Sequence, residues 1–409
     1  MINFIQSDFI NDPTSKKIMS LLNKEGDLAR FVGGCVRDSL INIRTKDIDI
    51  ATKYKPEKII EILSSNSIKV IPTGIDYGTV SVFTNNFNFE ITTLRSDIET
   101  DGRHAKVSFT DDWKKDSMRR DFTINSIYLS PNGDIFDPNN GTLDLAKGSV
   151  IFIGDPKERI LEDYLRILRY FRFNSYYGDE NIPFSSQAYE ACKDLRVKLK
   201  NLSPERIQSE FFKILVAPNA RKNISAMSEA NILKVIFDNP VDVSYFSRMV
   251  DIDSKNQYIP NPILRLISLI YLQNISYDQL KMFSLSNKKR DLISLIVDKK
   301  INFSHQMNIN ELNKHLYFYG SEICAFGVRV CWSVDTDLQN DDNWLELLSI
   351  IEAWKKPTFP IKAKDIISRG VEEGPLLGQI LNELENLWIS SNFIMDKDFL
   401  LNKVNKLIE

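Results

Sequence analysis

The pattern of apolar and polar positions along the chain changes character near residue 150. Before that point, short apolar runs alternate with Gly, Asn and Asp turns, which is typical of a sheet covered by a few helices. The pattern predicts helices over 13–23, 35–41 and 56–63, and strands over 28–32, 47–51, 68–71, 79–83, 87–93, 124–129 and 135–136. The first part is therefore expected to be an α/β unit with a mixed sheet.

From residue 155 onward the apolar positions recur almost entirely at helical spacing. Asp155 and Pro156 begin the first of these helices, with the aspartate as cap and the proline in the first turn. A single helix is expected to run through 159–172, another to start at 203, and others to cover 262–272, 286–298, 309–319, 343–354, 361–368, 375–390 and 397–408. The expected fold class is therefore α+β, with a helical remainder after the mixed sheet.

One polar stretch interrupts the strand pattern of the first part. Residues 96–116 contain few apolar anchors and carry Asp-Gly-Arg-His near their middle. We expect this stretch to be a long, mobile loop of the kind usually kept for function.

Composition narrows the possible functions. The chain has 409 residues, 43% of them hydrophobic, and a formal net charge of -3, so any basic surface for a nucleic acid must be local. Four widely separated cysteines are typical of reduced thiols in an intracellular protein, and three histidines argue against a His-rich metal site. The start of the chain does not resemble a signal peptide and no apolar run is long enough for a bilayer, so the expected location is the cytoplasm, without a membrane.

The first candidate site combines a glycine pair with two aspartates. Gly33 and Gly34 end an apolar run and allow the backbone to approach a phosphate, which Arg37 could bind with its forked donors. Asp47 and Asp49 stand two apart on an expected strand, so both side chains point to one face and could hold Mg²⁺. Each feature alone is more often an ordinary turn or solvated strand edge, but together they favour a metal and phosphate site.

Two further groups of charged residues follow. Arg119, Arg120 and Asp121 could bind a triphosphate and a ribose hydroxyl, although in isolation they would indicate a surface charge cluster. Glu90, on the expected strand 87–93, could be a third carboxylate of the site on the sheet. The sequence fits a structural or solvent-facing glutamate at this position at least as well. The third group forms a charged stripe along one expected helix. This stripe is either a solvent-facing set of ion pairs or a set of donors and acceptors that bind the edge of a nucleobase. It comprises Arg159, Glu162, Asp163, Arg166, Arg169 and Arg172.

These motifs, in this order, resemble those of the class II tRNA nucleotidyltransferases, the CCA-adding enzymes of the DNA polymerase β superfamily. The resemblance covers residues from about 28 to 215 and rests on the segments 31–38, 47–52, 119–125, 162–169 and 205–207. It implies a polymerase-β-like nucleotidyltransferase head over 1–150, a helical neck with a nucleotide-selecting helix over 151–215, a helical body over 216–285 and a helical, tRNA-binding tail over 286–409.

The resemblance also implies an activity. Such an enzyme adds C, C and A to the 3′ end of tRNA without a template, uses CTP and ATP, and releases pyrophosphate. Its partner is the acceptor arm and 3′ end of tRNA, and its cofactor is Mg²⁺. The loop around 100–104 matches the flexible loop implicated in the change from C to A addition.

Residue roles follow from the same resemblance. Asp47 and Asp49 match the catalytic, metal-binding carboxylates, and Asp163 with Arg166 matches the pair that reads the incoming base, with Glu162 expected to orient Arg166. The full set of expected nucleotide-binding residues is Gly33, Gly34, Arg37, Arg120, Asp121, Asp163, Arg166, Arg169 and Arg172.

Three alternatives remain open at this point. A bacterial poly(A) polymerase shares the head motifs but tends to carry a longer, strongly basic C-terminal extension, whereas residues 397–409 have mixed charge. A partial enzyme would add only CC or only A. A catalytically silent RNA-binding protein is disfavoured by the intact pair Asp47 and Asp49.

Overall fold

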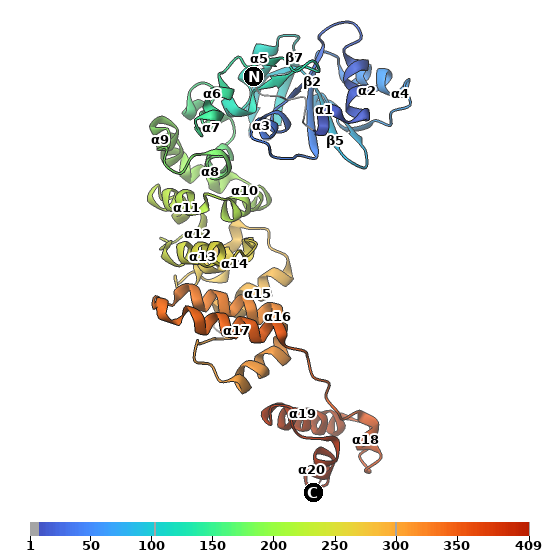
Figure 1. The fold of residues 1–409 in the computed structure, drawn as a ribbon, viewed down its shortest axis with the longest axis vertical. Coiled ribbons are helices and arrows are strands. Elements are labelled where there is room, and N and C mark those ends of the chain that lie inside the picture. The colour runs from blue at the N-terminus through green and yellow to red at the C-terminus, as the bar shows by residue number, and fades with distance from the viewer. Residues whose placement is uncertain (1–7, 102–103, 299–300, 409) are drawn as a thin grey trace. The chain divides into compact units, whose positions relative to one another are not determined.

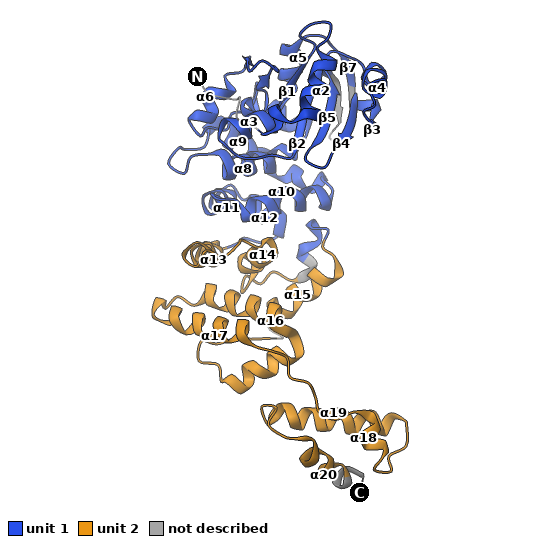
Figure 2. Ribbon diagram, turned by 45° about the vertical axis from the view of Figure 1, so that its right-hand side comes forward, with its two compact units in different colours: residues 1–241, 278–284 blue, residues 242–277, 285–409 orange. Residues whose placement is uncertain are grey.

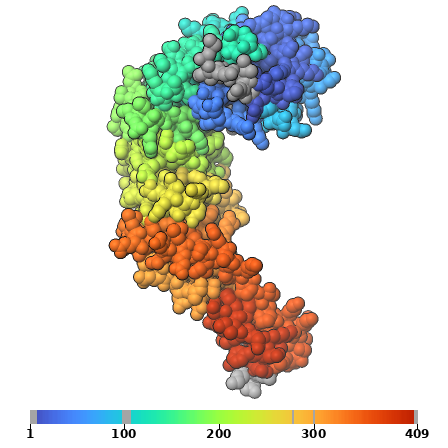
Figure 3. Space-filling view, viewed as in Figure 1, coloured from blue at the N-terminus to red at the C-terminus, as the bar shows by residue number. Residues whose placement is uncertain are grey.

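The computed structural model describes residues 8–101, 104–298 and 301–408, which belong to two compact units (Figures 1 and 2). Unit 1 comprises residues 1–241 and 278–284, and unit 2 comprises residues 242–277 and 285–409. In the space-filling view the blue, teal and green residues of unit 1 form one continuous body (Figure 3). The finer division into head, neck, body and tail stays a prediction.

Unit 1 contains the expected mixed sheet. Its seven strands have the order β3-β4-β5-β2-β1-β8-β9, and only β2 and β5 pair in parallel. The strands are β1 (Ala29–Val32), β2 (Asp47–Thr52), β3 (Ile71–Gly74), β4 (Thr79–Phe83), β5 (Asn88–Thr93), β8 (Tyr128–Leu129) and β9 (Ile135–Phe136).

The alternation of side chains along β2 separates core from site. Ile48 and Ile50 are buried in a core cluster with Ile18 of α2 (Pro13–Leu22) and Ile59 of α4 (Pro56–Ser64). Because successive side chains of a strand point to opposite faces, Asp49 is directed away from this core. The glycine turn follows β1 and leads into α3 (Gly34–Leu40). The short α1 (Asp8–Asn11) precedes α2.

The expected long loop over 96–116 is wrong as a description of secondary structure. Strands β6 (Arg95–Asp101) and β7 (His104–Phe109) pair as an antiparallel hairpin, and α5 (Trp113–Met118) follows. A hairpin needs only backbone hydrogen bonds, so its polar sequence did not reveal it. The Asp112 side chain begins α5 by accepting hydrogen bonds from the Lys114 and Lys115 amides at 2.8 and 3.3 Å. Residues 102–103, in the middle of the proposed flexible loop, lie outside the described residues.

Two predicted strands are also shifted or shortened. The strand expected over 124–129 is replaced by a 3₁₀ turn, η3 (Thr123–Asn125), and only the two residues of β8 pair in the sheet. The cause is the Asp121 side chain, which accepts hydrogen bonds from the Phe122 amide and the Asn125 side chain and so closes a turn. The strand expected over 68–71 begins only at Ile71.

The helical remainder has the expected character. In unit 1 it comprises α6 (Gly141–Ala146), α7 (Pro156–Glu162), α8 (Arg166–Tyr177), α9 (Ser186–Leu195), α10 (Pro204–Val216), α11 (Ala220–Glu229) and α12 (Ile232–Phe237). In unit 2 it comprises α13 (Ser244–Lys255), α14 (Pro262–Ile270), α15 (Asn287–Val297), α16 (Ile309–Val334), α17 (Asp341–Ala353), α18 (Ala363–Ile367), α19 (Pro375–Ser390) and α20 (Lys397–Ile408). The helix expected to end at 319 continues past a break at Gly320, where φ is 80°.

The single helix expected over 159–172 is wrong. The chain leaves the helix at Asp163, whose φ and ψ are -154° and 109°, and a second helix begins at Arg166. The Asp163 carboxylate accepts a hydrogen bond from the Leu165 amide at 3.1 Å, which stabilises this break. The charged residues therefore do not form one continuous stripe.

Among the helices of the described residues, none combines the length and the apolar character that crossing a membrane requires.

Gly141 provides a test of the packing behind the η3 turn. A Cβ at this position would lie 2.1 Å from the Thr123 carbonyl oxygen. We expect Gly141→Ala to destabilise the protein by about 2 kcal/mol, because the backbone must move to relieve the overlap. The thermal unfolding midpoint measures the loss. The control is Gly378→Ala in α19, where no atom lies within 4 Å of the added Cβ and an unchanged or slightly raised midpoint is expected. Equal effects in the two variants would contradict this account.

Candidate active site

A polar cavity of about 440 Å³ in unit 1 brings together residues from three separate parts of the sequence. All nine expected nucleotide-binding residues line it, although they span residues 33 to 172. Asp49 lines it as well, whereas Asp47 does not. The complete lining is Gly33, Gly34, Arg37, Asp49, Arg120, Asp121, Asn125, Asp163, Arg166, Arg169, Arg172 and Phe173.

The glycine turn closes one side of the cavity. Gly33 has φ +74° and ψ -129°, a backbone conformation that residues with a Cβ rarely adopt. A Cβ on Gly33 would stand 3.5 Å from both the Arg120 Nη1 atom and the Asp49 Oδ2 atom. Glycine therefore serves two purposes here: it permits the turn, and it keeps open the space between a guanidinium and a carboxylate.

The two aspartates of β2 have different environments. Asp49 is half-buried, and Asp47 is exposed and accepts a hydrogen bond from the Asn88 side chain at 3.0 Å. Burial raises the pKa of Asp49 to about 6, and Arg120 opposes this rise while Glu90 and Asp47 add to it. A carboxylate pair with this mutual repulsion supplies oxygen ligands that suit a hard divalent cation such as Mg²⁺.

Glu90 lies beside Asp49 on the neighbouring strand. The parallel register of β2 and β5 pairs these two residues directly, and the Glu90 side chain is exposed. Within the described parts of the chain, no group of three or more His, Cys, Asp or Glu residues could hold a metal ion. The assignment of Asp47 and Asp49 as metal ligands stays a prediction, and so does a role for Glu90 as a third carboxylate.

Arg37 is held firmly from behind. Arg37 is only 6% exposed, and its guanidinium donates to the Asn125 side chain, to Asp38 at 2.9 Å and to the Tyr177 hydroxyl at 2.7 Å. The guanidinium also stacks on the Tyr177 ring at 4.1 Å. These contacts restrict the rotamers of Arg37 and present its remaining surface to the cavity.

Asp121 holds Arg169 in the cavity wall. Its Oδ2 atom accepts a hydrogen bond from the Arg169 Nε atom at 2.7 Å, and its Oδ1 atom accepts from the Asn125 side chain at 2.9 Å. Burial alone would raise the pKa of Asp121, but Arg169 and Asn125 outweigh it and lower the value to about 2. The carboxylate is therefore ionised at neutral pH and mainly engaged with protein donors.

The expected base-reading pair lies at the break between α7 and α8. Asp163 accepts a hydrogen bond from the Arg206 side chain of α10 at 2.7 Å. Arg166 donates to Glu162 at 2.5 Å and to the Arg159 carbonyl oxygen at 2.8 Å, so the expected contact between Glu162 and Arg166 is present. Each member of the pair is thus oriented by a partner outside the cavity.

The sequence argument missed Asn125 and Phe173, which line the cavity, and several residues behind the cavity that hold its charged side chains. Asn125 closes the segment 119–125 that carried the resemblance, and its contact with Arg37 could have been suspected there. Nothing in the sequence indicated that Phe173 belongs to the site. The centre of its ring lies 4.3 Å from the Arg172 Cζ atom and 5.2 Å from the Arg37 Cζ atom. Arg206 and Glu210 of α10 hold Asp163 and Arg172. Arg206 stands in the segment 205–207 that carried the resemblance, but no role was expected for it.

Two family models match parts of unit 1. Residues 29–151 match the family described as the poly A polymerase head domain. Residues 182–241 match the family described as a probable RNA and SrmB- binding site of polymerase A.

Solved structures with similar folds cover almost the whole chain. The CCA-adding enzyme of Bacillus stearothermophilus in complex with CTP aligns with a TM-score of 0.76 and 22% identity, over 97% of this chain and 98% of that one. The Thermotoga maritima CCA-adding enzyme complexed with tRNA aligns with a TM-score of 0.67 and 19% identity, over 99% and 98%. These likenesses establish the fold.

Sequence relatives establish the family. The mitochondrial CCA tRNA nucleotidyltransferase 1 of Mus musculus is 34% identical over 397 residues, which covers 96% of this chain and 89% of that protein. The CCA-adding enzyme of Ligilactobacillus salivarius is 28% identical, over 96% and 97%. With this identity over nearly its full length, and with the nucleotidyltransferase fold in unit 1, the chain belongs to the class II tRNA nucleotidyltransferases, the CCA-adding enzymes.

Proposed function

We propose that this nucleotidyltransferase adds C, C and A to the 3′ end of tRNA, without a nucleic-acid template, from CTP and ATP and with release of pyrophosphate. One observation carries the proposal: a single cavity joins the glycine turn, Asp49, four arginines and the pair Asp163 and Arg166 in a chain of this family. Solved structures of CCA-adding enzymes with CTP, with ATP and with tRNA share the fold and support these partners.

Asp47 and Asp49 are the residues that would hold Mg²⁺. Both carboxylates are on β2, two positions apart, so that both side chains point to the same face of the strand. Bound there, a divalent cation supplies Lewis-acid assistance to transfer at the α-phosphate. The terminal ribose hydroxyl of the tRNA attacks that phosphorus, the new phosphodiester bond forms, and the bond to the pyrophosphate breaks.

The arginines compensate the charge of the triphosphate. Arg37 and Arg120 both lie near the glycine turn, 3.7 Å from a Cβ on Gly34 and 3.5 Å from a Cβ on Gly33, and both are fixed by hydrogen bonds to groups behind the cavity. Fixed guanidinium groups bind the negatively charged oxygens of the triphosphate without having to reorganise when the nucleotide arrives. Arg169 and Arg172 extend the positive wall along α8.

Base selection is the role proposed for Asp163 and Arg166. A carboxylate and a guanidinium offer acceptors and donors to a base edge, and such groups reject a mismatched base far better than an apolar pocket does. Arg206 and Glu162 hold this pair at the helix break, so the discriminating groups have defined positions.

A poly(A) polymerase is the second candidate, since the family model that matches residues 29–151 is described as a poly A polymerase head domain. Relatives named as CCA-adding over the whole chain favour CCA addition. A cytoplasmic location remains a prediction; the similar proteins from mouse and human are named as mitochondrial.

Substitution of either aspartate of β2 tests the metal site. We expect Asp47→Asn and Asp49→Asn each to reduce incorporation of labelled CMP and AMP by at least about a thousandfold, because the carboxylate charge needed for the cation is lost. Circular dichroism and thermal unfolding should show that both variants remain folded. The matched control is Asp134→Asn, an exposed aspartate in the turn before β9, which should retain full activity. Near-normal incorporation by either β2 variant would rule out this assignment.

Arg166→Ala tests base selection. We expect the preference for CTP and ATP over UTP and GTP to fall about tenfold to a hundredfold, since the donors that recognise the base edge are removed. Competition assays with mixed nucleotides, read by sequencing the products, measure the preference. Lys157→Ala on the preceding helix, where Lys157 is exposed and lies 3.5 Å from Asp194, is the control and should leave the preference unchanged. An unaltered preference in Arg166→Ala would place base selection elsewhere.

The length of the product separates the remaining alternatives. Transcripts lacking all three terminal nucleotides, lacking only the final adenosine, or complete are offered with labelled CTP and ATP, and the products are sequenced. We expect CCA on the first, a single A on the second and no addition to the third. A long A tract would instead identify a poly(A) polymerase, and arrest after two cytidines would identify a CC-adding enzyme.

A further inference from the structure

Asp116 is a fully buried carboxylate that lies behind the cavity rather than in it. It is on α5, its side chain is 0% exposed, and it is absent from the cavity lining. A charged group in such a position must be compensated by partners, because its transfer from water is strongly unfavourable. Its partners therefore show what it does.

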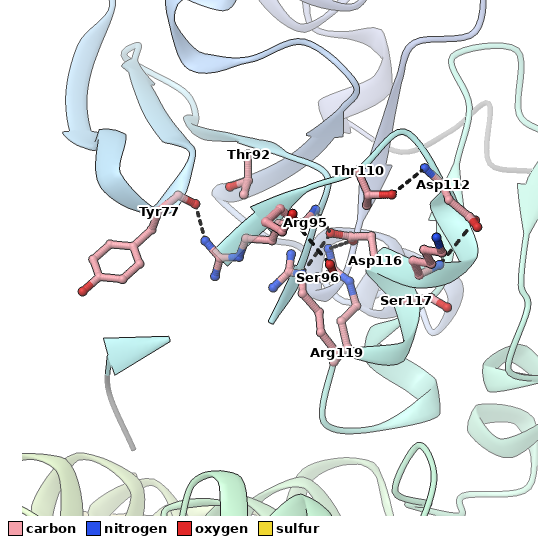
Figure 4. A network of polar contacts seen from close by, with 12 residues as sticks. Tyr77, Thr92, Arg95, Ser96, Thr110, Asp112, Asp116, Ser117 and Arg119 are labelled. Carbon is pink, nitrogen blue, oxygen red and sulfur yellow. Dashed lines mark hydrogen bonds and ion pairs between the residues drawn. The ribbon is translucent and has the colours of Figure 1, made fainter. Parts of the chain in front are cut away.

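Each oxygen of Asp116 accepts two hydrogen bonds. Oδ1 accepts from the Arg95 amide at 3.1 Å and from the Arg119 side chain at 2.9 Å. Oδ2 accepts from the Arg120 side chain at 3.2 Å and from the Tyr128 hydroxyl at 2.7 Å. Figure 4 shows the Asp116 carboxylate between the start of β6 at Arg95 and the side chain of Arg119.

These contacts fix one edge of the Arg120 guanidinium. Its Nη2 atom donates to Asp116, and its Nε atom donates to the Tyr128 hydroxyl at 3.3 Å. Its Nη1 atom donates a long hydrogen bond to the Asn125 carbonyl oxygen at 3.5 Å and is on the side of the glycine turn, 3.5 Å from the position of a Cβ on Gly33. Asp116 and Tyr128 thus hold the rear of the guanidinium, while Nη1 is directed toward the space proposed for the triphosphate.

The ionisation of Asp116 is consistent with its contacts to Arg119 and Arg120. Burial would raise the pKa of Asp116, but Arg120 and Arg119 more than offset that effect and lower it to about 2, so the carboxylate is ionised throughout the neutral range. One negative charge is shared between two guanidinium groups. Part of the positive charge of Arg120 is therefore left to act on the cavity.

We propose that Asp116 is the positioning residue for Arg120: its carboxylate, with the Tyr128 hydroxyl, sets the direction of the guanidinium that binds the nucleotide triphosphate. The inference rests on the proposed function, which places Arg120 against that triphosphate. Asp116 itself contacts neither the nucleotide nor the tRNA in this arrangement.

Asp116→Asn keeps the size of the side chain and removes its charge. In the full-length protein with tRNA, Mg²⁺ and either CTP or ATP, we expect the KM for each nucleotide to rise about tenfold, while kcat falls less than about threefold. The two KM values should rise by the same factor, because Arg120 acts on the triphosphate rather than on the base. A selective loss of A addition would instead indicate an action through the β6–β7 hairpin and would overturn the assignment.

Two further variants separate positioning from stability. Tyr128→Phe removes the second partner of the Arg120 guanidinium and should raise the same two KM values by a smaller factor. Asp112→Ala removes the side-chain cap of the same helix α5 and should lower the thermal unfolding midpoint with no change in either KM. A comparable KM increase in Asp112→Ala would show that only the integrity of α5 matters and would refute the proposal.

A double-mutant cycle with Arg120→Gln completes the test. If Asp116 acts through Arg120, adding Asp116→Asn to Arg120→Gln should change the KM less than about twofold further. Effects that multiply would overturn the positioning role. An active wild-type enzyme with an unaffected Asp116→Asn variant refutes this inference alone, whereas a wild-type protein that incorporates neither CMP nor AMP refutes the proposed function and this inference together.

Discussion

The site depends on the two-residue alternation of β2. The same six-residue strand supplies Ile48 and Ile50 to the core and Asp49 to the cavity. Because the core cluster fixes the register of β2 against β1 and β5, it also fixes where the carboxylates stand relative to the glycine turn that follows β1. A slip of one residue would bury the aspartates and expose the isoleucines, so the chemistry of this edge is tied to the packing of the core cluster.

Around that strand, the cavity is lined by arginine side chains that are each held by a carboxylate. Arg37, Arg120, Arg166, Arg169 and Arg172 each contact a carboxylate in the wall or behind it. A partly buried guanidinium without such a partner would be costly, and one with its partner has a defined direction. This arrangement suits a ligand with several negative charges, since the groups that bind it are already oriented before it arrives. It also explains why residues that never face the cavity, such as Asp116, are proposed to influence it.

Features that depend on residues close together in the sequence were predictable, and features that depend on contacts between distant residues were mostly not. The strand with Asp47 and Asp49, the glycine turn and the helices at 375–390 and 397–408 were predicted at or near their observed bounds, because each depends on local spacing. The hairpin β6–β7 was missed because backbone pairing, not apolar residues, forms it. The break at Asp163 was missed because its cause is the residue's own side chain accepting from the Leu165 amide, together with a contact to Arg206, 43 positions away.

The sequence by itself determined the family, the mixed sheet followed by helices, and most of the residues that line one cavity, since motifs of a few residues encode turns, strand faces and charge. Only the tertiary structure decided which groups hold those residues in place: Asp116 behind Arg120, Arg206 beside Asp163, and Asn125 with Tyr177 around Arg37. The physical reason is that a buried charge requires a partner but does not specify where in the sequence that partner stands. Packing of α5 against β6 and of α10 against α8 makes that choice.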